Sequence, residues 1–246
     1  MLALSHGRNR PATLPVAVQE AGAALARGEP VLLFDAPDRE GETDLVILSE
    51  LATPELIRLL RRDGGGVLFT AISAELREQL GLPFVAEMLE LSESKFPVTR
   101  ELRHETLRYD RRSSFGVSVN HRSTFTGVTD NDRARTVRAL GELARAAPRL
   151  DPETLRLRFT SEFASPGHVP ILYAAPRLLA ERKGHTELTI SLARMTGLSE
   201  CVTGCEMLGD SGGARSPEAA ARYAAEHGWR FLDGETVREA WDRWAA

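Results

Sequence analysis

The chain has 246 residues, of which 42% are hydrophobic, and this content is enough for one substantial core. Its 31 basic and 35 acidic residues are interspersed and give a net charge of -4 at pH 7, so no basic stripe favours nucleic acid as a partner. The sequence has no run of eighteen apolar residues, and its N-terminus carries charged residues without an apolar signal region. We therefore expect a cytoplasmic protein with no membrane partner.

Short apolar runs alternate with helical patterns along the first half of the chain. The alanine-rich stretch over 16–27 is amphipathic and stops before Gly28, which predicts a helix. The further expected elements are strands over 31–34, 45–48 and 67–72, a helix opened by Thr53 and Pro54, and a helix from Ser73 to Gly81. The segment 95–112 is dense in charge and has no clean period, so we predict a loop, lid or excursion there and assign it no function.

The second half continues the alternation. The expected elements are strands over 115–119 and 201–208 and helices over 186–195, 216–228 and 234–244. The spacing of Cys201 and Cys205 fits neither a zinc site nor a redox pair, so we predict buried thiols. The pattern as a whole indicates an α/β (α+β) fold, a single domain over residues 1–246 with helices packed around a mixed β-sheet.

An acidic loop follows the apolar run over 31–34. Five carboxylates lie within ten residues there: Asp35, Asp38, Glu40, Glu42 and Asp44. Their mutual repulsion must be relieved by bound cations, by raised pKa values or by full exposure to water. The loop is therefore interpreted either as a divalent-metal site or as a solvated surface loop.

Three further polar motifs follow in order. Residues 124–133 offer hydroxyls and carboxylates, although Thr129 and Asp132 also make a helix-capping pattern. In segment 165–170, two prolines and a glycine fix the backbone around His168, which fits a ligand or an ordinary turn residue. In segment 182–187, Thr186 is expected to cap a helix and Glu187 to stand in its first turn.

The order and identity of these motifs resemble the 3,4-dihydroxy-2-butanone-4-phosphate synthase family of riboflavin biosynthesis. The resemblance extends from about residue 30 to residue 237, and it includes the acidic loop, the Pro-Gly-His and Gly-His-Thr-Glu segments, and Cys205-Glu206-Met207. It is strongest to the archaeal-type, monofunctional branch of the family. It implies a lyase that converts D-ribulose 5-phosphate to 3,4-dihydroxy-2-butanone 4-phosphate and formate.

The resemblance also implies roles for single residues. Glu40 and His168 would hold Mg²⁺ or Mn²⁺, and Arg39 would bind the sugar phosphate. Glu42 and Asp44 would meet substrate hydroxyls, and Glu187 would transfer protons, which makes these three the implied catalytic residues. The implied substrate-binding set is Arg39, Glu40, Asp44, Thr126, Ser165, Pro166, Gly167, His168, Val169 and Glu187. Family members are homodimers with the site near the subunit interface, so a homodimer is expected.

Two departures from the family pattern leave alternatives open. Phe69 stands where the family often has cysteine, and Ser165 stands where many members have arginine, so Arg39, Arg133 or Arg138 would have to supply the phosphate charge. A different metal-dependent sugar-phosphate isomerase or aldolase is one alternative. A non-catalytic sugar-phosphate-binding regulator is the other.

Overall fold

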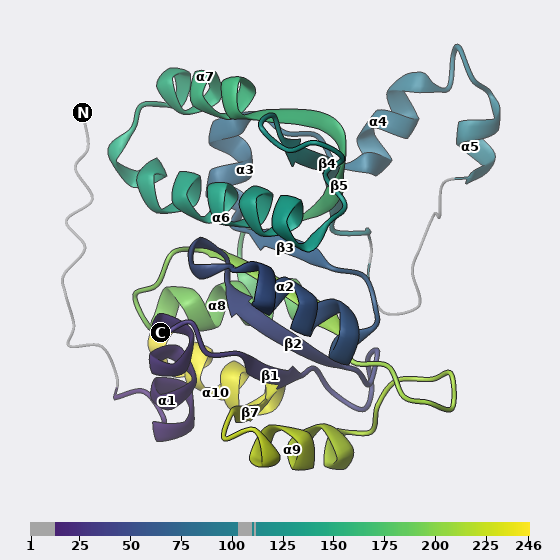
Figure 1. The fold of residues 1–246 in the computed structure, drawn as a ribbon. Helices are drawn as coiled ribbons and strands as arrows, with labels where there is room; N and C mark the ends of the chain where they lie inside the picture. Colours follow the sequence, from purple (N-terminus) through teal and green to yellow (C-terminus); the bar gives the residue numbers. More distant parts are fainter. Residues whose placement is uncertain (1–12, 103–109, 111) are drawn as a thin grey trace.

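All the strands in the part of the chain that is described belong to one mixed sheet (Figure 1). The computed structural model describes residues 13–102, 110 and 112–246. The strands are β1 Val31–Phe34, β2 Thr43–Leu48, β3 Phe69–Ile72, β4 Phe115–His121, β5 Phe163–Tyr173, β6 Cys201–Glu206 and β7 Arg230–Asp233, in the spatial order β4-β5-β3-β6-β2-β1-β7. The β1–β7 and β3–β5 pairs are parallel and the others antiparallel, which confirms the expected mixed sheet.

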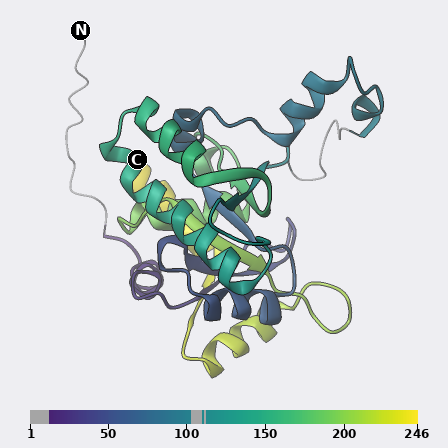
Figure 2. The same ribbon diagram turned by 45° about the horizontal axis from the view of Figure 1, so that its top comes forward.

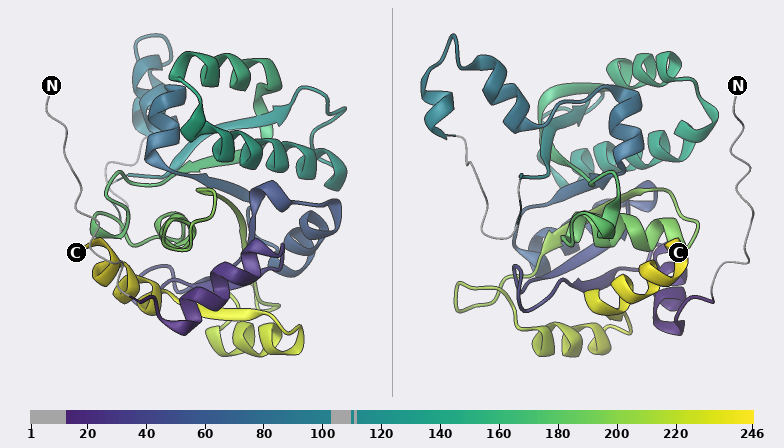
Figure 3. Two further views of the ribbon diagram at one scale, coloured as in Figure 1. Left: turned by 90° about the vertical axis from the view of Figure 1, so that its left-hand side faces the viewer. Right: turned by 180° about the vertical axis from the view of Figure 1, so that it is seen from behind.

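Helices cover both faces of this sheet (Figures 1 and 3). The helices α1 Val16–Ala26, α8 His185–Met195 and α10 Gly234–Ala245 share a hydrophobic cluster with one face. The helices α2 Pro54–Leu59, α3 Ala74–Leu80, α6 Asp130–Ala146, α7 Pro152–Glu162 and α9 Pro217–Glu226 share a second cluster with the other face. Shorter turns are the 3-10 helices Ser49–Leu51, Ala147–Arg149 and Leu178–Ala180 and the π-helix Leu60–Gly64. The sheet is therefore the middle of three layers.

Two helices stand apart from these layers. The helices α4 Val85–Ser92 and α5 Val98–Leu102 project from the body and have no buried residue (Figure 2). The segment 95–112, predicted to be a loop, lid or excursion, contains α5, while its residues 103–109 and 111 lie outside the described part. Within the described residues, no helix is long and apolar enough to cross a membrane.

Most elements predicted from start and stop signals are confirmed. The hydroxyls of Thr53, Ser73 and Ser216 each accept a backbone N–H in the first turn of the helix that they open. The strands predicted over 67–72 and 201–208 are shorter than expected, because β3 begins at Phe69 and β6 ends at Glu206. Cys201 and Cys205 are buried and unpaired, as predicted, and burial raises the pKa of each thiol to about 12.

The longest helix and the longest strand among the described elements were not predicted. α6 alternates alanine with arginine, so its apolar stripe of Val137, Leu140 and Leu143 is diluted in the sequence, and only its Thr129 cap was noticed. β5 contains two prolines, which argue against a strand. It pairs nonetheless, because Val169 pairs with Val119 and Ala164 with Asn120, so that residues 165–168 loop out of the ladder. The helix α7 and the strand β7 were also missed.

A buried hydroxyl contact crosses the sheet and gives a prediction about stability. Thr203 on β6 lies 2.9 Å from the hydroxyl of Ser49 and 2.8 Å from that of Thr70, and all three residues are fully buried. Thr203→Val is expected to lower the free energy of unfolding by roughly 1–3 kcal/mol, because two buried hydroxyls lose their partner. Urea denaturation followed by circular dichroism measures the change. In Thr160→Val, a control at an exposed hydroxyl, the change should stay within about 0.5 kcal/mol; equal stability of the two variants would contradict the prediction.

Candidate active site

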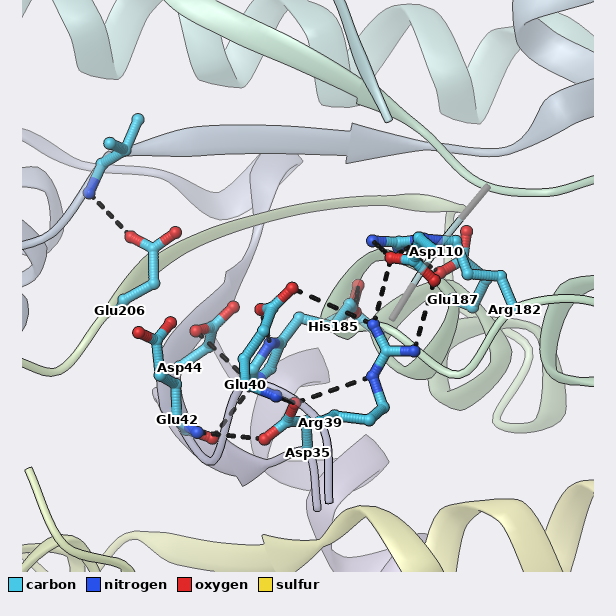
Figure 4. A network of polar contacts seen from close by, with 12 residues as sticks. Asp35, Arg39, Glu40, Glu42, Asp44, Asp110, Arg182, His185, Glu187 and Glu206 are labelled. Carbon is cyan, nitrogen blue, oxygen red and sulfur yellow. Dashed lines mark hydrogen bonds and ion pairs between the residues drawn. The ribbon is translucent and has the colours of Figure 1, made fainter. Parts of the chain in front are cut away.

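The acidic loop between β1 and β2 is folded back on itself by the buried carboxylate of Asp35 (Figure 4). Its two oxygens accept the backbone N–H groups of Glu40 and Glu42, each at 3.0 Å. The backbone N–H of Asp35 also donates to the carbonyl of Glu42 at 3.1 Å, and Gly41 takes a positive φ of 67° within the turn. Asp35 thereby fixes the backbone that carries the side chains of Glu40 and Glu42.

Sheet geometry brings further groups to the loop. Side chains alternate across a strand, and Asp44 on β2 projects to the same face as Val46 and Leu48, toward α8. Glu206 on β6 is its cross-strand neighbour, so two carboxylates stand directly opposite each other, which is unfavourable without compensation. A pocket of about 400 Å³ lies over them and is lined by Glu40, Glu42, Asp44, Phe69, Ser113, Ser114, Phe115, Leu172, Arg182, His185, Thr186 and Glu206.

The carboxylates at the base of this pocket are partly or fully buried close to one another, which disfavours their charged forms. Asp44 is fully buried, and neither of its oxygens has a hydrogen-bond partner among the described residues. Burial, together with the carboxylates of Glu206, Glu40 and Glu42, raises the pKa of Asp44 to about 8, although His185 opposes the shift. Burial and the charges of Glu40 and Glu206 also raise the pKa of Glu42. The pocket therefore attracts positive charge.

His185, the first residue of α8, supplies part of that charge. Its Nδ1 lies 3.5 Å from Oε2 of Glu40 and its Nε2 lies 3.6 Å from Oδ1 of Asp44. Burial lowers the pKa of His185, but the neighbouring Asp44, Glu40 and Asp35 outweigh it and raise the pKa to about 9. Asp35, Glu40 and His185 offer ligand atoms that lie within 4.8 Å of one another. This group has the donor types and the spacing of a divalent-metal site.

Arg182 lines this pocket, and it shares the carboxylate of Asp110 with Arg39 (Figure 4). Arg182 donates to Glu187 at 2.6 Å and to Asp110 at 2.8 Å, and Arg39 donates to both oxygens of Asp110 at 3.3 and 3.4 Å. Glu187 is fully buried, and its second oxygen accepts the backbone N–H of Ala175 at 2.9 Å. Burial raises the pKa of Glu187, and Arg182 opposes that shift.

The other arginines expected to supply the phosphate charge lie elsewhere. Arg133 pairs with Asp130 at 3.5 Å, and Arg138 donates to the carbonyl of Ala52. Both lie on α6, on the opposite face of the sheet from α8. Arg39 is thus the one member of the expected set of three that lies in the pocket region.

The remaining expected residues form a second cluster, around Asn120 of β4. The side-chain oxygen of Asn120 accepts the backbone N–H of His168 at 2.8 Å, and its Nδ2 lies 3.1 Å from the His168 ring. A Cβ on Gly167 would lie 2.0 Å from the backbone of Val119, and a Cβ on Gly127 would lie 2.1 Å from the Asn120 amide. Both glycines therefore let the chain pass close to β4. Asn120 joins the 165–168 bulge to the loop that carries Thr126.

The two clusters are separate within one chain. His168 lies four residues before Leu172, roughly 13 Å farther along β5 at about 3.3 Å per residue. Glu40 contacts His185, and no contact between Glu40 and His168 occurs among the described residues. Ser165, Pro166 and Thr126 are exposed in this second cluster, while the side chain of Val169 is buried in the core, which leaves only its backbone to line a site.

Several residues of the pocket were missed or misjudged in the sequence. Gly184, rather than Thr186, is the N-cap of α8, which places His185 at the helix start. His185 and Arg182 belong to a motif that was noticed but received no site role, and Glu206 was likewise noticed only as part of a motif. Asp110 gave no signal, because it lies more than 70 residues from both arginines that it contacts.

A larger depression, of about 620 Å³, lies between α3, the end of α6 and the end of α8. Its charged side chains already pair with one another: Arg194 contacts Glu75 at 2.8 Å and Glu200 at 2.7 Å, and Arg145 contacts Glu50 at 2.6 Å. We place the active site in the smaller pocket, because it contains Asp44, a buried carboxylate with no hydrogen-bond partner among the described residues.

Comparison with known proteins gives a consistent result. The family model described as 3,4-dihydroxy-2-butanone 4-phosphate synthase matches residues 19–240. The chain is 41% identical to the synthase of that name from Methanothermobacter thermautotrophicus over 92% of this chain and 96% of the relative. It is 43% identical to that from Archaeoglobus fulgidus over 90% of this chain and 92% of the relative.

Solved structures agree with the sequence comparison. A 3,4-dihydroxy-2-butanone 4-phosphate synthase in its cation-free form superposes with a TM-score of 0.70 at 25% identity, over 95% of this chain and 100% of that one. A synthase in complex with two magnesium ions superposes with a TM-score of 0.69 at 25% identity, over 89% of this chain and 94% of that one. The fold expected from the sequence resemblance is thereby confirmed.

Proposed function

Because this chain belongs to the 3,4-dihydroxy-2-butanone 4-phosphate synthase family, we propose that it converts D-ribulose 5-phosphate to 3,4-dihydroxy-2-butanone 4-phosphate and formate in riboflavin biosynthesis. The two products together contain all the atoms of the substrate, so the reaction needs no oxidant or other co-reactant. It does need several proton transfers at neighbouring carbons. The observation that supports this proposal best is the convergence of Glu42, Asp44 and Glu206 beside the Asp35–Glu40–His185 group in one pocket.

The residues fit a divalent cation, because Asp44 has no hydrogen-bond partner among the described residues and Asp35, Glu40 and His185 place ligand atoms within 4.8 Å of one another. Both oxygens of Asp35 are occupied by backbone N–H groups, so we propose Glu40 and His185 as the protein ligands. The magnesium-bound synthase structure supports Mg²⁺ as the cation, and use of Mn²⁺ stays a prediction. When bound, the cation would polarise the carbonyl and hydroxyl oxygens of the sugar.

The other side chains divide into proton carriers and phosphate donors. Glu42 and Asp44 line the pocket where the sugar would lie, and we propose that they exchange protons with it, together with Glu206. Arg182 lines the pocket and Arg39 contacts the same Asp110, and we propose that these two guanidinium groups bind the phosphate. Proton transfer by Glu187 stays a prediction. Both of its oxygens already accept hydrogen bonds within the chain, from Ala175 and Arg182.

A homodimer would bring the two clusters together in one site. We propose that the end of β4–β5 in one copy, with Thr126 and the 165–168 bulge, faces the pocket of the other copy, so that His168 completes the site across the interface. The fully exposed Phe125, at 99%, stands next to Thr126 and suits burial in such an interface. A single domain and a cytoplasmic location remain expectations from the sequence.

The proposed reaction can be tested directly by its second product. Purified protein incubated with D-ribulose 5-phosphate and Mg²⁺ should release formate in equal amount to the pentose phosphate consumed, and a chelator should stop the release. Formate dehydrogenase coupled to NADH absorbance measures the yield. Loss of substrate without formate would favour a different sugar-phosphate isomerase or aldolase, and binding without turnover would favour a regulator.

Metal binding separates the two candidate histidines. Glu40→Gln and His185→Asn should each weaken Mg²⁺ binding by at least tenfold, because each removes a proposed ligand, whereas His168→Ala should bind Mg²⁺ within about threefold of the unaltered protein. Isothermal titration calorimetry without substrate measures these affinities. Weakened binding in His168→Ala with normal binding in His185→Asn would restore the ligand pair implied by the resemblance.

The shared site predicts complementation between two inactive variants. Glu40→Gln and His168→Ala should each lose turnover alone. If they are mixed, unfolded and refolded together, half of the dimers should pair the two variants and carry one intact site, which restores about a quarter of normal activity. Refolding each variant alone is the control. No recovery on mixing, with dimers present by sedimentation, would show that the site is not shared.

A further inference from the structure

The guanidinium of Arg182 is held on two sides by carboxylates. Its Nη1 donates to Oε2 of Glu187 at 2.6 Å, while its Nε and Nη2 lie 2.8 and 2.7 Å from Oδ2 of Asp110. An arginine has five N–H groups in a fixed plane. Among the described residues, these contacts occupy three of them and leave one N–H on Nη1 and one on Nη2. These two N–H groups can donate to a phosphate.

Gly184 lies against a third side of the Arg182 guanidinium. A Cβ at this position would lie 2.2 Å from Nη1 and 2.6 Å from Cζ of Arg182, so the guanidinium lies directly against the bare Cα. The backbone of Gly184 has φ of -85° and ψ of 169°, which any residue adopts. The glycine is therefore required by the position of Arg182 and not by the turn that precedes α8.

Asp110 also ties Arg182 to the acidic loop. The same carboxylate contacts both Nη atoms of Arg39, whose guanidinium lies 3.7 Å from Asp35 and 3.9 Å from Glu40. Two guanidinium groups repel each other, and an intervening carboxylate offsets this repulsion. Asp110 is the described residue that contacts both arginines, and its side chain is only 6% exposed. It therefore spaces the two cations relative to each other.

We propose that Asp110 is a positioning residue for phosphate recognition: its carboxylate, with Glu187 and the bare Cα of Gly184, fixes Arg182 and Arg39 in the arrangement that binds the phosphate of the substrate. The proposal rests on the proposed function in taking a sugar phosphate as the ligand. Asp110 acts through the arginines and touches no reacting atom. Its loss should therefore weaken binding and leave the chemical step nearly unchanged.

The competing possibility is that Asp110 pairs with the arginines as a substitute anion, which phosphate would have to displace. A substitute anion would compete with phosphate, so its removal would strengthen phosphate binding. A positioning carboxylate has the opposite effect, because without it the guanidinium planes lose their fixed orientation and repel each other. The sign of the change in phosphate affinity therefore separates the two.

The test compares Asp110→Asn with the unaltered protein. The KM for D-ribulose 5-phosphate should rise about tenfold with kcat within about threefold, and the affinity for inorganic phosphate, measured by calorimetry in the presence of a chelator, should fall by a similar factor. The calorimetric measurement needs no turnover. If the unaltered protein released no formate, the proposed function would fail, while the phosphate measurement would still decide the role of Asp110.

Two further variants make the test specific. Glu200→Gln is the matched control, because Arg194 is also held between two carboxylates, Glu75 and Glu200, but in the depression outside the active site. It should leave KM and phosphate affinity unchanged. Gly184→Ala should reproduce the effect of Asp110→Asn, since its methyl group displaces Arg182, and thermal melting should show both variants folded.

Three results would overturn the proposal. One is tighter phosphate binding in Asp110→Asn. The second is a large loss of kcat with KM unchanged. The third is an equal loss of phosphate affinity in Glu200→Gln, which would show a general effect of removing a carboxylate.

Discussion

The accumulation of carboxylates over one end of the sheet is the constraint on which the rest of this site depends. Asp35, Glu40, Glu42, Asp44 and Glu206 converge where β2 begins and β6 ends. Burial makes such a group costly, because charged forms lose their hydration and repel one another. Three features offset this cost. Asp35 accepts two backbone N–H groups, and His185 and two arginines surround the cluster. In addition, the pKa of Asp44 is raised to about 8. A divalent cation would complete the compensation.

The sheet decides which groups meet. Strand alternation sends Asp44, Phe69, Leu172 and Glu206 to the face that α8 covers, while their neighbours in sequence, such as Leu45 and Cys205, enter the core on the other face. The start of α8 then brings His185 to Glu40 and, one residue earlier, leaves room at Gly184 for the guanidinium of Arg182. The pocket is thus assembled from strand ends, the loop between β1 and β2, and the start of one helix.

The division of charge within the pocket suggests how it handles a phosphorylated sugar. Glu42, Asp44 and Glu206 lie on one side of the site, and Arg182 with Asp110 and Glu187 lies on the other (Figure 4). A ligand with a phosphate at one end and a chain of hydroxyl and carbonyl groups at the other matches this polarity. The Asn120 cluster, with the exposed residues His168 and Thr126, is a second group of polar side chains outside this pocket.

The sequence by itself determined the elements whose signals are local. Caps at Thr53, Ser73 and Ser216, the glycine stops and the apolar runs predicted most helices and strands, and the ordered motifs predicted the family and the acidic loop as the centre of the site. Local signals were weak where polar residues diluted the apolar stripe of α6 and where proline interrupted β5, so these elements were missed. Only the tertiary structure decided which histidine meets Glu40 and which carboxylate joins Arg39 to Arg182. Those contacts join segments that lie far apart in the chain, and their geometry follows from strand order and register, which no local pattern of residues records.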